Sequence, residues 1–156
     1  MTDKSPLLYW DSCPFIALIG ENKERREMCR LIMKEAEKGN LRILTSAFTF
    51  AEVIRPEGQP ILDTEQELQV LRFLANEYII VRWVDRQIGD MARQVSRQTG
   101  LKPPNAIHVA TALRLEAEVL HTYDQKMLRQ NRKVGIPPLQ IEEPRWDVQP
   151  EMPLKD

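Results

Sequence analysis

The sequence predicts a three-layer α/β/α domain with a mainly parallel central sheet. Short β-rich segments alternate with longer helical segments, the pattern of a parallel sheet covered by helices on both faces. The clearest segment is 103–113, where two prolines and Asn105, a favourable N-cap, open an apolar helix that a β-rich run follows at 119–122. Eight of the eleven residues from 106 to 116 are apolar or threonine, so this helix should be buried on several sides.

Size and composition indicate a single domain. A chain of 156 residues and 18.2 kDa can bury a core without disulfides or a structural metal. We expect the domain to span 1–143, with residues 144–156 as a tail, docked or disordered, because no periodicity is visible there. The net charge of −1 argues against a surface wholly devoted to nucleic acid, but it allows a local basic groove beside an acidic centre.

The cysteine spacing, the absence of a long apolar run and the N-terminal residues argue against a cysteine-bound metal site, a membrane protein and a secreted protein. Cys13 and Cys29 lack metal-ligand spacing, and no apolar run approaches the ~20 residues that span a bilayer. The N-terminus has no basic start followed by an apolar segment, as a secretory signal would have. We therefore expect a cytoplasmic protein with no membrane partner.

The remaining elements follow from local patterns. Strands are expected at 7–10, 41–45, 79–84 and 119–122, with an edge strand at 138–141, where proline is tolerated. Helices are expected after Asp11, with Pro14 in the first turn, and at 24–38, 63–76, 85–100 and 125–133. A further helix should open at Thr49, where Thr49 and Glu52 fit the capping-box pattern and place Glu52 in the first turn.

Three carboxylates each follow a predicted strand by a few residues. They are Asp11, Glu52 and Asp124, and Asn105 at the start of its helix would join them. The carboxyl ends of parallel strands meet at one sheet edge, where ligands bind. Carboxylates gathered there repel one another, and a hard divalent cation relieves the repulsion. Oxygen ligands without a His or Cys set favour Mg²⁺ or Mn²⁺ over zinc.

Each of these residues also has a purely structural explanation. Taken singly, helix capping explains the acids and Asn105 better than metal binding does, and Asp63 and Asp85 are interpreted as caps alone. His108 is better explained as a hydrogen-bonded core or rim histidine than as a base. Basic residues after Asp124 are typical of a solvated face, although they would border the same edge: Lys126, Arg129, Arg132 and Lys133.

Four motifs together carry a resemblance to a known family over about residues 5 to 142. They are Tyr9-Trp10-Asp11-Ser12, Thr49-x-x-Glu52-x-x-Arg55, Pro104-Asn105-Ala106-Ile107-His108 with the run that follows, and Thr122-Tyr123-Asp124. The chain resembles the PIN-domain family, in particular VapC-type toxin ribonucleases. The resemblance implies a Mg²⁺- or Mn²⁺-dependent endoribonuclease acting on single-stranded RNA, with an antitoxin partner and homodimerisation. It further implies catalytic roles for Asp11, Glu52, Asn105 and Asp124, metal binding by the three acids, and supporting roles for Ser12 and Thr122.

Position 105 departs from the family pattern, which has aspartate there. Asn105 can offer a carbonyl oxygen to a metal, but it lacks the negative charge and cannot accept a proton from water. The main alternative is therefore a PIN-like module that binds RNA or protein without cutting it. A phosphoacceptor receiver domain is a third possibility, but the adjacent acids at the first strand and the late lysine that it needs are not at fitting positions.

Overall fold

The computed structural model describes residues 5–56 and 58–147. In this part of the chain five strands form one sheet with the order β3-β2-β1-β4-β5, and every neighbouring pair is parallel. The strands are β1 Leu7–Trp10, β2 Arg42–Ser46, β3 Ile79–Arg82, β4 Val119–His121 and β5 Gln140–Glu142. The predicted fold class is therefore confirmed, and all carboxyl ends of the strands lie at one edge.

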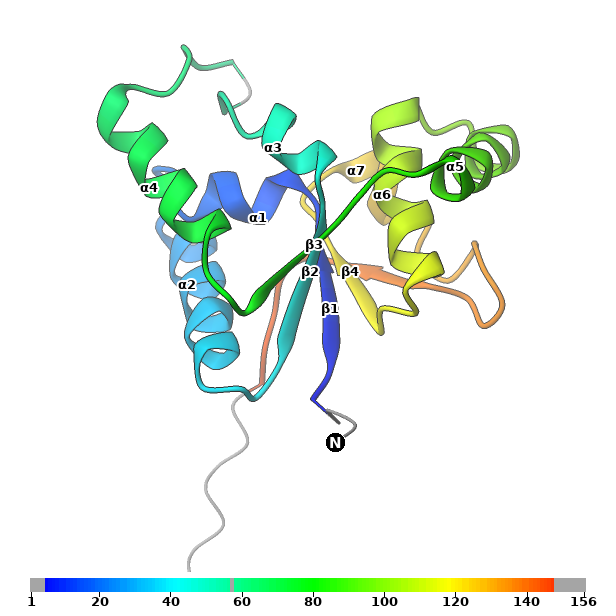
Figure 1. Cartoon of the computed structure of the whole chain (residues 1–156), viewed down its shortest axis with the longest axis horizontal. Helices are drawn as coiled ribbons and strands as arrows, with labels where there is room; N and C mark the ends of the chain where they lie inside the picture. The colour runs from blue at the N-terminus through cyan, green and yellow to red at the C-terminus, as the bar shows by residue number, and fades with distance from the viewer. Residues whose placement is uncertain (1–4, 57, 148–156) are drawn as a thin grey trace, which may run out of the picture.

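Helices cover both faces of this sheet (Figure 1). One face carries α1 Ser12–Ala17, α2 Lys23–Glu37 and α4 Thr64–Leu74, and the other carries α5 Arg86–Thr99, α6 Pro103–Arg114 and α7 Gln125–Leu128. The short helix α3 Phe48–Glu52 follows β2 at the carboxyl edge of the sheet. This arrangement gives the three layers that the alternation of elements predicts.

Two hydrophobic cores lie on opposite faces of the sheet, because successive side chains of a strand point to opposite faces. In β1, Leu8 and Trp10 pack with residues of α1, α2 and α4, whereas Tyr9 packs with residues of α5 and α6. Ile43 and Leu44 of β2 divide in the same way. Strands buried on both faces therefore appear in the sequence as continuous apolar runs rather than as alternating ones.

Most helix boundaries agree with the local signals, but the N-caps predicted at Asn105 and Thr49 are wrong. Asp63 and Asp85 cap α4 and α5 as predicted. Asn105 is not an N-cap, because α6 already begins at Pro103 and Asn105 is its third residue. Proline favours the first helical position, where its missing N–H is not needed.

The helix after β2 also differs from its prediction. It begins at Phe48, whose N–H donates to Ser46 Oγ at 3.1 Å, so Glu52 is its last residue and not part of a capping box. Thr49 instead shares a hydrogen bond of 2.7 Å with the Thr45 hydroxyl. The serine turn at the end of β2 starts the helix before Thr49, and the helix has only five residues, so Glu52 lies at its end instead of in its first turn.

The helix predicted at 125–133 ends at Leu128. Beyond it the chain is tied to the last strand: the N–H of Ile141 donates to Asn131 Oδ1 at 2.8 Å, and the N–H of Arg132 donates to the Leu139 carbonyl at 2.9 Å. These bonds hold the connection as a turn, which a longer helix would prevent. The last strand itself is an edge strand, as predicted.

The described part of the tail lies against the domain. Pro144 is buried and Trp146 packs against the core that contains Trp10. Residues 148–156 of the predicted tail lie outside the described residues. No helix in the described ranges combines the length and the apolar character needed to cross a bilayer.

Candidate active site

The strand order changes direction between β1 and β4. From β1 the sheet grows through β2 to β3 on one side and through β4 to β5 on the other. In open parallel sheets the crevice beyond the carboxyl ends at such a switch point is where ligands bind. Asp11 directly follows β1, and Thr122 to Asp124 directly follow β4.

Asp11 is a buried carboxylate at this switch point. Its side chain is only 2% exposed, and it caps α1 by accepting a hydrogen bond from the Cys13 N–H at 2.9 Å. Burial raises the pKa of the Asp11 carboxyl, and the nearby Glu52 charge raises it further, whereas His108 and the Thr122 hydroxyl act in the opposite direction. A carboxylate with a second acid beside it is electrostatically unfavourable without a cation, because burial and like charge both oppose ionisation.

Glu52 reaches the same place from α3 and is held by a histidine. Its Oε1 contacts Nε2 of His108, which is 1% exposed, while Glu52 itself remains 24% exposed. The other ring nitrogen of His108, Nδ1, lies 2.6 Å from the Tyr9 hydroxyl. His108 is thus a hydrogen-bonded core histidine, as expected, but its two partners come from elements that sequence reasoning did not connect to it.

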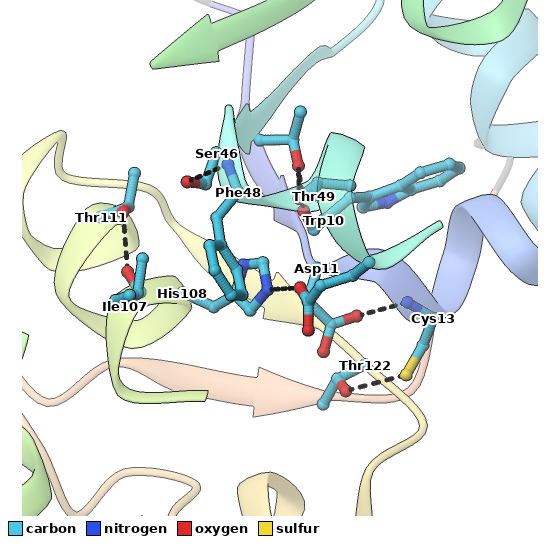
Figure 2. A network of polar contacts seen from close by, with 12 residues as sticks. Trp10, Asp11, Cys13, Ser46, Phe48, Thr49, Ile107, His108, Thr111 and Thr122 are labelled. Atoms are coloured by element: carbon cyan, nitrogen blue, oxygen red, sulfur yellow. Dashed lines mark hydrogen bonds and ion pairs between the residues drawn. The ribbon is translucent and has the colours of Figure 1, made fainter. Parts of the chain in front are cut away.

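Thr122 links the ends of β1 and β4. Its hydroxyl interacts with the Asp11 carboxylate, lies 3.7 Å from Cys13 Sγ, and accepts a hydrogen bond from the Asp124 N–H at 3.0 Å. Figure 2 shows Asp11, Cys13, His108 and Thr122 gathered in one region. Ser12, the other predicted supporting residue, is the first residue of α1 and lies directly beside Asp11.

The structure gives Asp124 and Asn105 less central positions. Asp124 caps α7 by accepting from the Met127 N–H at 3.0 Å, and it lines a cavity of about 280 Å³ with Cys13, Arg25 and other residues. Asn105 is half-buried one turn before His108 on α6, and its side-chain amide makes no hydrogen bond within the described part of the chain. The Asp11 carboxyl group thus interacts electrostatically with Glu52, whereas its connection to Asp124 runs through the Thr122 hydroxyl.

The donor chemistry of this region fits a hard cation better than a soft one. Among residues 5–56 and 58–147, no group of three or more His, Cys, Asp or Glu side chains is arranged to hold a metal ion. The Asp11 and Glu52 pair nevertheless suits Mg²⁺, which proteins usually bind through one or two carboxylates while it keeps several waters. Burial raises the pKa of both Cys13 and Cys29 to about 12, so neither thiol is an ionised ligand at neutral pH.

Solved structures that share this fold include three from bacteria. A toxin–antitoxin complex from Klebsiella pneumoniae matches with a TM-score of 0.56 and 22% identity, over 80% of this chain and 90% of that chain. VapC20 from Mycobacterium tuberculosis, a toxin that cleaves the sarcin–ricin loop, matches with a TM-score of 0.60 and 11% identity, over 78% and 93%. VapBC2 from Rickettsia felis, bound to a DNA fragment of its promoter, matches with a TM-score of 0.62 and 17% identity, over 90% and 99%.

At the level of sequence, no curated protein matches this chain. The model of the PIN domain matches residues 8–133, a range that begins in β1, ends beyond α7 and includes Asp11, Glu52, Asn105 and Asp124. With the parallel sheet, the acids at its carboxyl edge and a match over most of its length, the chain belongs to the PIN-domain family.

Proposed function

We propose that this PIN domain is a metal-dependent endoribonuclease that cleaves single-stranded RNA as the toxin of a toxin–antitoxin pair. The observation that carries the proposal is the placement of buried Asp11 beside Glu52 at the switch point of the sheet. The similar structures support it, because one is a toxin–antitoxin complex and another is a toxin that cleaves the sarcin–ricin loop.

In this proposal Asp11 and Glu52 hold Mg²⁺ or Mn²⁺, and Asp124 is the third acid of the site. The bound cation would supply Lewis-acid activation of water and charge stabilisation at the scissile phosphate. Thr122 orients the site by contacting the Asp11 carboxylate and the backbone of Asp124. Asn105 offers an amide oxygen and an amide N–H, so it can position a ligand but cannot take up a proton.

Exposed cations near Asp124 are suited to hold the RNA backbone. Lys126 and Arg129 are exposed on and after α7, directly beyond the carboxyl edge of β4. Arg25 lies 4.1 Å from the centre of the Tyr123 ring and lines the same cavity as Asp124. Contacts of this kind neutralise phosphates and give a binding constant that falls with salt concentration. An RNA substrate of this kind also favours a cytoplasmic location.

Exposed apolar side chains support the proposed protein partners. Over α3, α4 and the loop between them the exposed large hydrophobic residues are Phe50, Ile54, Ile61, Leu68 and Leu71, and at the β3 end of the sheet they are Ile80, Trp83 and Val84. Apolar surface gathered in this way is typical of protein interaction sites. We propose that an antitoxin and a second copy of this chain cover these surfaces, which would give a homodimer within the toxin–antitoxin complex.

A cleavage assay on single-stranded RNA tests the proposed activity. We expect cleavage with Mn²⁺ or Mg²⁺, none with a chelator, and loss of cleavage in Asp11→Ala. Asp85→Asn is the control, since Asp85 is an exposed cap of α5 whose side chain contacts the Ile88 N–H and Arg82. Cleavage that persists in the chelator, or in Asp11→Ala, would contradict the proposed site.

The second candidate is a PIN module that binds RNA without cutting it, and Asn105 is the observation that favours it. The same assay separates the two candidates with Asn105→Asp. In a weakened nuclease the restored acid should raise the cleavage rate by at least ~10-fold, which corresponds to ~1.4 kcal/mol of barrier. If neither form cuts RNA while both bind it, the binding module is the correct interpretation.

A further inference from the structure

A buried hydrogen-bonded series joins β1, α6 and α3. The Tyr9 hydroxyl of β1 lies 2.6 Å from Nδ1 of His108, and Nε2 of His108 contacts Oε1 of Glu52. Tyr9 and His108 are almost completely buried, and only Glu52 reaches solvent. The series therefore runs from the interior of the domain outward to the carboxyl edge of the sheet.

The imidazole ring of His108 is fixed in orientation as well as in place. It makes edge-to-face contacts with Tyr9, at 5.7 Å between ring centres, and with Phe48, at 6.1 Å. Phe48 begins α3, the helix that ends with Glu52, so the ring packs against the same helix whose carboxylate it contacts (Figure 2). Rotation of the ring would break both hydrogen bonds.

The direction of the two bonds follows from the groups involved. An ionised carboxylate only accepts hydrogen bonds, so Nε2 carries the proton that His108 donates to Glu52. A hydroxyl can donate or accept, so Tyr9 satisfies Nδ1 while leaving the proton on Nε2. A phenylalanine at position 9 would leave Nδ1 buried without a partner, and the ring would lose one of the two hydrogen bonds that hold its orientation.

We propose that His108, held by Tyr9, is a positioning residue that orients the Glu52 carboxylate toward the metal. One oxygen of Glu52 is occupied by His108, which leaves the other oxygen for the cation. In protein metal sites, partners that orient a ligand in this way typically change metal affinity ~10- to 100-fold when they are removed. This inference rests on the proposed metal-dependent function, and it assigns the imidazole no part in the reaction itself.

The chain offers a matched control in its other histidine. His121 is buried to the same extent, at 1% exposed, and it also has a glutamate nearby, since its Nε2 lies 4.0 Å from Glu142 Oε1. Its Nδ1 accepts a hydrogen bond from Trp10 Nε1 at 3.2 Å, on the other face of the sheet from Tyr9. Substitution of His121 thus removes a buried, hydrogen-bonded histidine without touching Glu52.

The test is the dissociation constant of Mn²⁺, measured by electron paramagnetic resonance on the purified full chain. We expect His108→Leu to weaken Mn²⁺ binding ~10- to 100-fold. Tyr9→Phe should weaken it in the same direction but less, and His108→Gln, which keeps an N–H donor, should recover part of the loss. His121→Leu should leave the constant within ~2-fold of the original protein, even where it lowers the melting temperature as much as His108→Leu does.

A double-mutant cycle with Glu52→Gln decides whether the effect passes through Glu52. If it does, His108→Leu should cause little further loss of affinity in the Glu52→Gln background. If the original protein binds Mn²⁺ and neither His108→Leu nor Tyr9→Phe changes the constant, the inference is wrong while the proposed function stands. If the original protein binds no Mn²⁺, the metal-dependent function and the inference both fail. Should His108→Leu not fold, the same outcomes are read from Tyr9→Phe and His108→Gln.

Discussion

At the scale of single residues, the candidate site places an acidic side chain, that of Asp11, in the buried interior of the domain. Asp11 is buried at the switch point, and both burial and the neighbouring Glu52 raise the pKa of its carboxyl group. A group whose folded pKa is raised stabilises the fold below its unfolded pKa, and this contribution is lost as the pH rises through the folded pKa. At neutral pH an ionised Asp11 therefore destabilises the metal-free domain.

We expect Asp11→Asn to raise the melting temperature of the metal-free protein by a few degrees. Asparagine caps helices about as well as aspartate, so the bond from the Cys13 N–H is kept while the charge is removed. In a domain of this size ~1 kcal/mol corresponds to roughly 2–4 °C. Thermal melts with and without Mn²⁺ provide the measurement, and the stabilisation by Mn²⁺ should disappear in the variant.

The control for this prediction is Asp63→Asn, which makes the same chemical change at an exposed cap on α4. It should alter the melting temperature little and should leave the Mn²⁺ effect intact. A drop of many degrees in Asp11→Asn would mean that the charge of Asp11 is needed to hold α1 in place. The interaction of this charge with the N-terminus of α1, and not metal binding, would then explain the residue.

At the scale of elements, α5 supports the helix that carries His108. Its buried residues Ile88, Ala92 and Val95 pack in the same core as Ala106, Val109 and Ala110 of α6. The helix ends at Thr99 and is capped by Gly100, which adopts a left-handed conformation with φ of 75°. The stability of α5 therefore bears directly on the position of the site residues on α6.

Gly89 of α5 and Gly100, which caps this helix, give opposite predictions for the same substitution. Neither has an atom within 4 Å of an added Cβ, so only backbone conformation distinguishes them. Gly89→Ala, inside the helix, should stabilise the protein by up to ~1 kcal/mol. Gly100→Ala should destabilise it by ~1 kcal/mol, because a side chain disfavours the left-handed region.

Urea denaturation of both variants measures the difference, and each serves as the control for the other. Changes of the same sign would show that packing or the unfolded state dominates at these positions, contrary to the backbone argument. A change in the slope against urea concentration would indicate an altered unfolded state rather than an altered helix end.

At the scale of the whole molecule, one buried histidine should make stability depend on pH. Burial lowers the pKa of His121 to about 4, with the charge of Arg145 acting in the same direction. The unfolded chain binds this proton near pH 6.5 and the folded chain does so only near pH 4. The free energy of unfolding should therefore fall as the pH is lowered from 6.5 toward 4.

Protonation would also place a donor on His121 Nδ1, opposite the N–H of Trp10 that now donates to it. Urea denaturation between pH 4 and 7 measures the dependence, and His121→Leu should flatten it over this window. The comparison of slopes matters more than the absolute stability, since the variant also loses the bond to Trp10. An unchanged slope would show that other groups, such as Asp11, control the acid response.

The site was predictable from the sequence to the extent that it depends on local position. Asp11 follows the first strand and Thr122 to Asp124 follow the fourth, so their placement at one edge requires only that the strands be parallel. The contact of His108 with Glu52 and Tyr9 was not predictable in this way. Along the chain His108 is 56 residues from Glu52 and 99 residues from Tyr9, and no local pattern connects them.

The sequence by itself determined the alternation of strands and helices, the caps Asp63 and Asp85, and the acids near strand ends, because each depends on neighbours a few residues away. The tertiary structure alone decided the strand order, the end of α7 at Leu128 and which acids meet. These features depend on groups that are distant in the chain and become neighbours only when the sheet is assembled and its two cores are packed. For this reason Glu52 contacts His108 and acts electrostatically on Asp11, while Asp124 caps α7.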